Sequence, residues 1–126
     1  MIVILHHNAN ALHIGSDDIR MLEPDAFIAT LKTHPDVRQV IAGHVHLTST
    51  ATWRGLPFTT LAGGHYSVSF NVDQPSAPIR RLRGPGQMAV VVGTEERTTV
   101  LFDDFIDGNG EIVLAQQAPE VEAEVA

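Results

Sequence analysis

Three histidines come directly after apolar runs of sequence, where a metal site would be expected. His6 follows Ile2–Leu5, and His44 and His46 follow the apolar residues 40–43. Neutral imidazole is the commonest protein ligand for metals such as Zn, Fe, Mn and Co. In open α/β sheets, ligands bind just outside the carboxyl ends of the strands. The residue types and positions therefore predict a divalent metal site with His6, His44 and His46 as ligands.

The spacing of His44 and His46 leaves the number of ions open. Residues two apart in an extended segment point to the same side, whereas in a tight loop they can straddle two adjacent ions. Gly43 has no Cβ, which would let the backbone come close to a neighbour. The alternative is that each histidine is a hydrogen-bonded surface or core residue, as a single histidine after a strand usually is. The His-x-His pair together with a second strand-end histidine favours the metal.

A strand, a helix and a second strand would position these histidines. Ile2–Leu5 is a run without polar interruption, which is typical of a strand buried on both faces. Pro24 and an acidic residue after it suit the first turn of a helix, and Pro35 ends that helix near residue 34. Residues 37–42 return to strand character. We expect an α/β (α+β) fold with a β-rich carboxy-terminal part.

From Thr48 onward the pattern predicts strands and turns alone. Residues 50–53 and 57–61 flank Arg54-Gly55, which is a plausible hairpin turn. Further strands are predicted at residues 67–72, 87–92, 98–102 and 111–114. The proline-containing residues 73–85 are expected to form a long loop or an irregular edge. Residues 119–126 are low in complexity and are predicted to be disordered, which leaves residues 1–118 as one domain.

The charge balance and the residue types of the chain argue against some classes of binding partner. The chain has 126 residues and a net charge of −7, with 8 basic and 15 acidic residues. This balance argues against a nucleic-acid or anionic-membrane surface, which would need a basic patch. It leaves room for a phosphate substrate, because bound metal ions can supply local positive charge. There is no cysteine, so thiolate metal sites are excluded, and the apolar start is too short for a signal peptide or a membrane span. We expect a cytoplasmic protein.

Two of these motifs resemble the last two motifs of the calcineurin-like metallophosphoesterases. Leu5-His6-His7 is similar to their His-His motif, and residues 43–46, Gly-His-Val-His, to their Gly-His-x-His motif. The interval between the motifs suits the class III branch of cyclic-nucleotide phosphodiesterases and glycerophosphodiesterases. Residues 50–57 resemble that branch's x-G-x-P hairpin, and the likeness covers residues 2–72. Asn8 stands where the branch usually has proline. The resemblance implies part of a four-layer α/β/β/α sandwich.

The resemblance also implies roles for individual residues. His6 and His44 would bind the second of two divalent metal ions (Mn, Fe, Zn or Co), and His46 would bind the first. His7 and His65 are the candidates for substrate binding, although a plain loop histidine is the alternative at position 65. The family's Asp-x-His, Gly-Asp and Asn-His motifs, which carry the bridging carboxylate and the transition-state histidine, cannot be placed in this sequence. The implied activity is metal-dependent hydrolysis of a small phosphodiester.

A buried strand at the amino terminus needs neighbours on both sides. We therefore expect that the site is completed either by a missing amino-terminal half or by another copy in a homo-oligomer. The rival hypothesis is a non-catalytic remnant that serves as a β-rich binding or oligomerisation module. Upstream coding sequence with an Asp-x-His motif would favour the enzyme, and an upstream stop codon without such sequence would favour the remnant.

Overall fold

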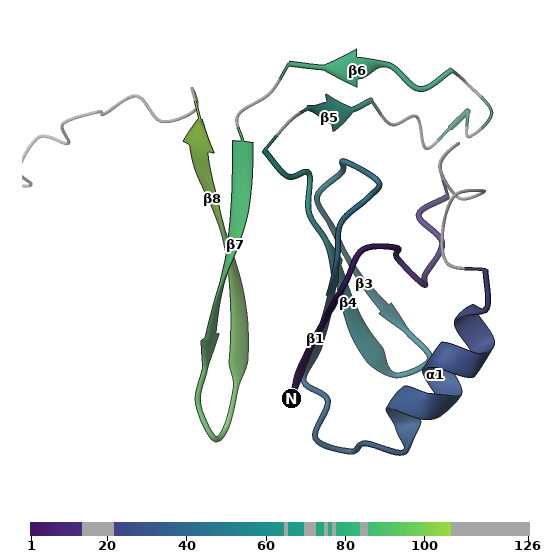
Figure 1. Ribbon diagram of the computed structural model, residues 1–126, viewed down its shortest axis with the longest axis vertical. Helices are drawn as coiled ribbons and strands as arrows, with labels where there is room; N and C mark the ends of the chain where they lie inside the picture. The colour runs from purple at the N-terminus through teal and green to yellow at the C-terminus, as the bar shows by residue number, and fades with distance from the viewer. Residues whose placement is uncertain are drawn as a thin grey trace, which may run out of the picture.

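A mixed four-stranded sheet forms the centre of the structure, a computed structural model that describes residues 1–13, 22–64, 66–69, 73, 74, 76, 78–83 and 86–106. The strands lie in the order β1-β2-β4-β3 (Figure 1). β1 (Ile2–Leu5), β2 (Gln39–Ala42) and β4 (Leu56–Thr60) are parallel to one another, and β3 (Ser49–Trp53) pairs antiparallel with β4. Strand β1 has the bounds that the sequence predicted.

The register of the parallel strands places their carboxyl ends together. Leu5 pairs with Ala42, and Ala42 pairs with Thr60. The loops that follow β1 and β2 therefore begin side by side at one edge of the sheet.

β3 and β4 are joined by the predicted hairpin turn at Arg54 and Gly55, whose φ angles of 51° and 78° suit a tight two-residue turn.

One face of the sheet is covered by the helix α1 (Pro24–Lys32). The helix begins at the proline that the sequence indicated, with an acidic residue in its first turn and Lys32 in its last, both favourable to the helix dipole. Buried apolar side chains from the helix, the sheet and the first loop form the core, namely Ala9, Ile28, Leu31, Val40 and Phe58. This core holds α1 against β2 and β4.

Two further antiparallel strand pairs follow the central sheet in the described residues. β5 (Ser67–Val68) pairs with β6 (Arg81–Leu82), and β7 (Gly86–Gly93) pairs with β8 (Thr98–Ile106) (Figure 1). The prediction of a long loop or an irregular edge over residues 73–85 did not include the two-residue strand β6, and β8 extends beyond residue 102, where the sequence predicted its end. The strand predicted at residues 111–114 lies outside the described residues, as does the tail at residues 119–126.

The expectation that β1 is buried on both faces is wrong. Val3 and Leu5 pack against the core, but Ile4 is 77% exposed. Alternate side chains of a strand point to opposite faces, and α1 covers only one of them. On the other side, an open cavity of about 500 Å³ lies between the sheet and the β7–β8 hairpin, with Ile4, Met88 and Phe105 in its lining.

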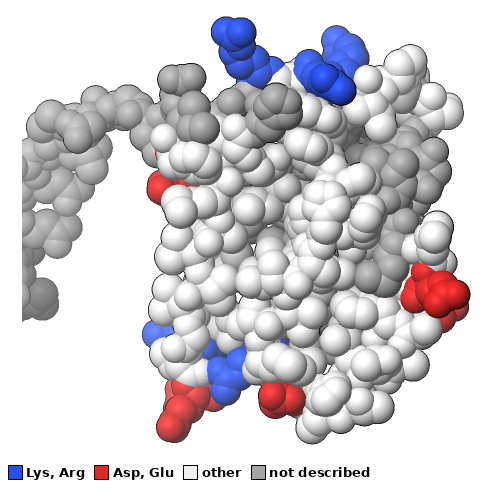
Figure 2. All heavy atoms as spheres, viewed as in Figure 1, with Lys and Arg blue, Asp and Glu red and all other residues white. Residues whose placement is uncertain are grey.

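The described residues thus form a mixed α+β fold, mostly strands with one helix. No helix in this part of the chain has the length and apolar character needed to cross a membrane. Figure 2 shows that the visible face carries few charged side chains at its centre, whereas basic side chains gather at the end of the molecule where β6 lies.

Candidate metal centre

The candidate metal centre lies at the carboxyl ends of β1 and β2. His6 is the residue directly after β1, and His44 comes two residues after the end of β2. Because these strands are parallel neighbours with Leu5 opposite Ala42, both histidines start from the same edge. The amide of Gly43 donates a hydrogen bond of 3.1 Å to the carbonyl oxygen of His6, which joins the two loops directly.

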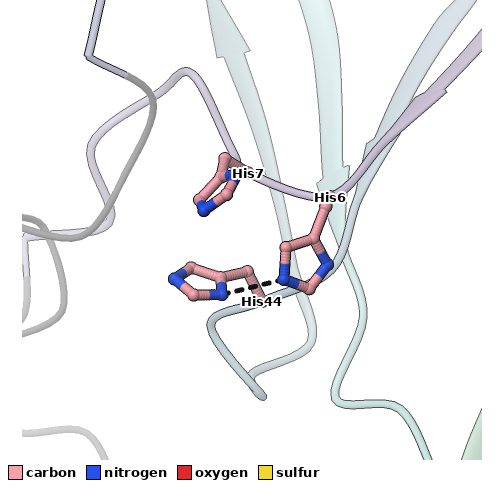
Figure 3. A group of neighbouring side chains, drawn as sticks. All are labelled: His6, His7 and His44. Carbon is pink, nitrogen blue, oxygen red and sulfur yellow. Dashed lines mark hydrogen bonds between the residues drawn. The ribbon is translucent and has the colours of Figure 1, made fainter.

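Three imidazoles cluster at this edge (Figure 3). Nδ1 of His44 lies 3.0 Å from Nε2 of His6, so one of the two nitrogens donates a hydrogen bond to the other. The ring of His7 is centred 4.4 Å from that of His44 and 4.9 Å from that of His6. One nitrogen from each of the three rings lies within 4.8 Å of the others. The structure therefore brings together two of the predicted ligands and adds His7.

The donor set fits a divalent transition metal. Imidazole nitrogen binds Zn at about 2.0–2.1 Å, so two nitrogens on one ion lie at most about 4.2 Å apart. The His6–His44 pair, at 3.0 Å, already meets that limit. Since the three nitrogens all lie within 4.8 Å of one another, a shift of the His7 ring toward the other two would bring it in as well. Three histidines are also a known ligand set for a catalytic zinc ion.

The surroundings of His44 disfavour the charged form of its ring. Partial burial, followed by the neighbouring imidazoles of His7, His6 and His46, lowers the pKa of His44 below its ordinary value of 6.5. Burial disfavours the charged ring, and each protonated neighbour would repel a second positive charge. A histidine that resists protonation keeps a free lone pair near neutral pH, which is what a metal ligand needs.

The loop after β2 has an uncommon backbone. His44 and His46 have φ angles of 67° and 52°, in the left-handed region that residues with a Cβ seldom adopt. Such a conformation costs of order 1–2 kcal/mol per residue. Val45 lies between them with its side chain buried, and its amide donates to the carbonyl oxygen of Gly43 at 2.8 Å. Burial of Val45 helps to hold the loop, and backbone strain of this kind is concentrated at functional sites.

His46, the third predicted ligand, is not part of the three-histidine cluster. Its Nδ1 atom lies 2.9 Å from the carbonyl oxygen of Tyr66, and its ring stacks on the ring of Tyr66 at 4.0 Å with an angle of 2° between the planes. It is nevertheless close enough to His44 to lower the pKa of that residue. His6 and His44 therefore contact each other, whereas His46 lies near them and contacts Tyr66.

Two further expectations concern Gly43 and His65. A Cβ added at Gly43 would lie 3.8 Å from Nδ1 of His6, which is an ordinary contact, so glycine is not needed there for a close approach. The expectation that Gly43 serves by lacking a Cβ is therefore wrong. His65, a candidate for substrate binding, lies outside the described residues.

Two buried asparagines follow the histidines in the first loop. The side-chain amide of Asn8 donates a hydrogen bond of 2.7 Å to the carbonyl oxygen of Asn10, and both residues are buried. Within the described residues, the side-chain oxygen of each has no hydrogen-bond partner. A buried acceptor left unpaired costs about 1–3 kcal/mol. These acceptors could not be predicted from the sequence, because an asparagine in a polar loop carries no signal of burial.

No protein-family model matches the chain, and no curated protein sequence matches it. The resemblance to the metallophosphoesterases therefore stays a prediction from the sequence motifs.

Proposed function

We propose that the chain binds divalent metal through His6 and His44 and forms part of a dinuclear metallophosphoesterase site that hydrolyses small phosphodiesters. The observation that carries this proposal is the 3.0 Å approach of two histidine nitrogens at the carboxyl ends of adjacent parallel strands. The motifs in which the two histidines stand favour a substrate of the cyclic-nucleotide or glycerophosphodiester type. A cytoplasmic location belongs to the same proposal.

Each imidazole has a distinct part in this proposal. His6 and His44 hold one ion, and the lowered pKa of His44 keeps its ring neutral for that purpose. His7 lies beside them and either completes the ligand set or donates a hydrogen bond to a phosphate oxygen. His46, whose Nδ1 atom is hydrogen-bonded to the carbonyl oxygen of Tyr66, has Nε2 left for the other ion of the pair. When bound, the metals supply charge neutralisation at phosphate and a hydroxide nucleophile at neutral pH.

The remaining ligands must come from elsewhere. Among the residues that the structure describes, the cluster consists of imidazoles alone. The class of site in the proposal also uses a bridging carboxylate, which we expect from a further segment or from another subunit. The sheet with α1 on one face would then form one half of a four-layer α/β/β/α sandwich. We accordingly expect the 126-residue chain by itself to hydrolyse phosphodiesters poorly.

Hydrolysis of bis-p-nitrophenyl phosphate with Mn or Zn tests this proposal. The 126-residue chain should turn over far more slowly than the 1 per second or so at which ordinary enzymes begin. A longer chain that carries an Asp-x-His motif should restore turnover, and His44→Ala should abolish it there. Turnover that survives His44→Ala would contradict the assigned site. Fast turnover by the 126-residue chain that is lost in His44→Ala would instead show that the chain builds a complete site.

A non-catalytic binding or oligomerisation module is the second candidate function. The exposure of Ile4 on β1 and of Leu101 and Phe105 on β8 favours it, because apolar groups in the open are typical of surfaces that bind other proteins. A longer chain with all family motifs that binds metal but shows no turnover would support this candidate over the enzyme.

A further inference from the structure

We infer that Tyr66 and Arg81 form a brace that positions His46 so that its Nε2 atom faces a metal ion. The inference rests on the proposed function for the role of His46 as a ligand. The arrangement of the three side chains does not depend on that function, and the test below separates the two.

The hydrogen bond to Tyr66 fixes the proton on the His46 ring. Nδ1 of His46 lies 2.9 Å from the main-chain carbonyl oxygen of Tyr66, and a carbonyl oxygen can only accept. The proton of the neutral ring is therefore on Nδ1, and Nε2 carries the free lone pair. Metal-binding histidines commonly donate their other N–H to a carbonyl or carboxylate in this way. The bond selects the tautomer that a metal on Nε2 requires.

Stacking fixes the plane of the ring. The rings of His46 and Tyr66 are parallel to within 2° at 4.0 Å, and Cζ of Arg81 lies 4.6 Å from the centre of the Tyr66 ring. Tyr66 thus contacts both the imidazole of His46 and the guanidinium group of Arg81, and these two contacts restrict the position of its ring. The tyrosine ring serves as a support for His46.

The backbone of β5 and β6 holds the same residues in place. The amide of Val68 donates a hydrogen bond of 3.0 Å to the carbonyl oxygen of His46, and Val68 pairs with Arg81 in the β5–β6 register. The main chain of His46 and the two members of its brace are therefore tied to one small strand pair. This attachment accounts for the retention of the positive φ angle of His46, which is 52°.

Plain packing of aromatic groups is the alternative explanation. Plain packing predicts no preference for one tautomer of His46 and no effect of the Tyr66 ring on Zn binding. Nuclear magnetic resonance observes the ring nitrogens of each histidine separately. Zn bound at His46 is therefore distinguished from Zn bound at the His6–His44 pair. The measurement needs only the 126-residue chain, without metal and then with added Zn.

We expect the metal-free chain to show His46 with its proton on Nδ1, and Zn to shift the Nε2 resonance. Tyr66→Phe keeps the stack and should behave like the wild type. Tyr66→Leu removes the stacked ring and should weaken Zn binding at His46 by about tenfold or more, and Arg81→Ala removes the other contact of that ring and should change Zn binding in the same direction. Arg83→Ala, which removes an exposed arginine two residues after Arg81, is the matched control.

A proton on Nε2 in the wild type would overturn the brace. So would unchanged Zn affinity at His46 in a folded Tyr66→Leu variant, even if Zn binds well. If His46 has its proton on Nδ1 but Zn shifts none of the histidines, the proposed function fails, and the ligand role of His46 fails with it.

Discussion

Nδ1 of His44 lies 3.0 Å from Nε2 of His6, although the two residues are 38 positions apart in the sequence. The approach follows from the pairing of β1 with β2, in which Leu5 lies opposite Ala42. Each histidine needs only a short loop beyond its strand to reach the other. The parallel pairing of β1 with β2 thus places the two candidate ligands side by side.

Metal binding should depend on this pair. We expect Zn or Mn to bind the 126-residue chain and His44→Ala to weaken that binding at least tenfold, because one of the two closest nitrogens is lost. Isothermal titration calorimetry measures the change. His34→Ala, in an exposed histidine beyond α1, serves as the matched control and should bind like the wild type. Equal affinity in wild type and His44→Ala would refute the site.

Acidification should destabilise the metal-free chain through His44. The folded-state pKa of His44 is below its ordinary value of 6.5, so near that pH the unfolded chain binds the proton more readily than the folded chain does. The contribution is therefore fully present above the unfolded-state pKa and is lost as the pH falls below it toward the folded-state value. Urea unfolding at pH values of about 7.5 and 5.5 measures this loss.

His44→Gln is the comparison for the pH experiment, since it keeps a polar side chain that does not titrate. The loss of unfolding free energy between the two pH values should be smaller in His44→Gln than in the wild type. An identical loss in both proteins would show that His44 contributes nothing to the pH dependence.

Gly43→Ala should be tolerated, despite its place beside the histidines. The added Cβ would meet the ring and carbonyl of His6 at ordinary contact distances, and Gly43 does not have a positive φ angle. The free energy of unfolding should rise by about 0.4–1 kcal/mol because the unfolded chain loses freedom. Gly55→Ala is the control. A Cβ at Gly55 would meet no neighbour, but the φ angle of this residue is 78°, so the free energy of unfolding should fall by about 1 kcal/mol. Thermal unfolding of both variants distinguishes these outcomes, and a Gly43→Ala variant that loses Zn binding would contradict the expected tolerance.

The chain should associate through the exposed side of β1. Ile4 is 77% exposed, and among the described residues β1 pairs with β2 alone. An open strand edge with an apolar side chain is prone to pair with another chain. Light scattering at rising concentration should therefore detect dimers or larger species, and Ile4→Lys should reduce them. Ala29→Lys adds the same charge on the exposed side of α1 and should leave association unchanged. A stable wild-type monomer at high concentration would count against this prediction.

The sequence by itself determined the elements that position the site. An uninterrupted apolar run defined β1, a proline followed by an acidic residue marked the start of α1, and Arg54-Gly55 marked the turn between β3 and β4. These are local signals, because side-chain branching, a fixed proline ring and a glycine act on their own stretch of backbone. The nearness of His6 and His44 could be predicted as well, since neighbouring parallel strands end at the same edge.

Only the tertiary structure decided where the other groups lie. The clustering of His7 and the stacking of His46 on Tyr66 depend on loop backbone angles and on a strand pair distant in sequence. The exposure of Ile4 was decided in the same way, because burial of a strand depends on what covers each of its faces. An apolar residue has the same local preference whether a face is covered or open, so no pattern within β1 could distinguish these outcomes.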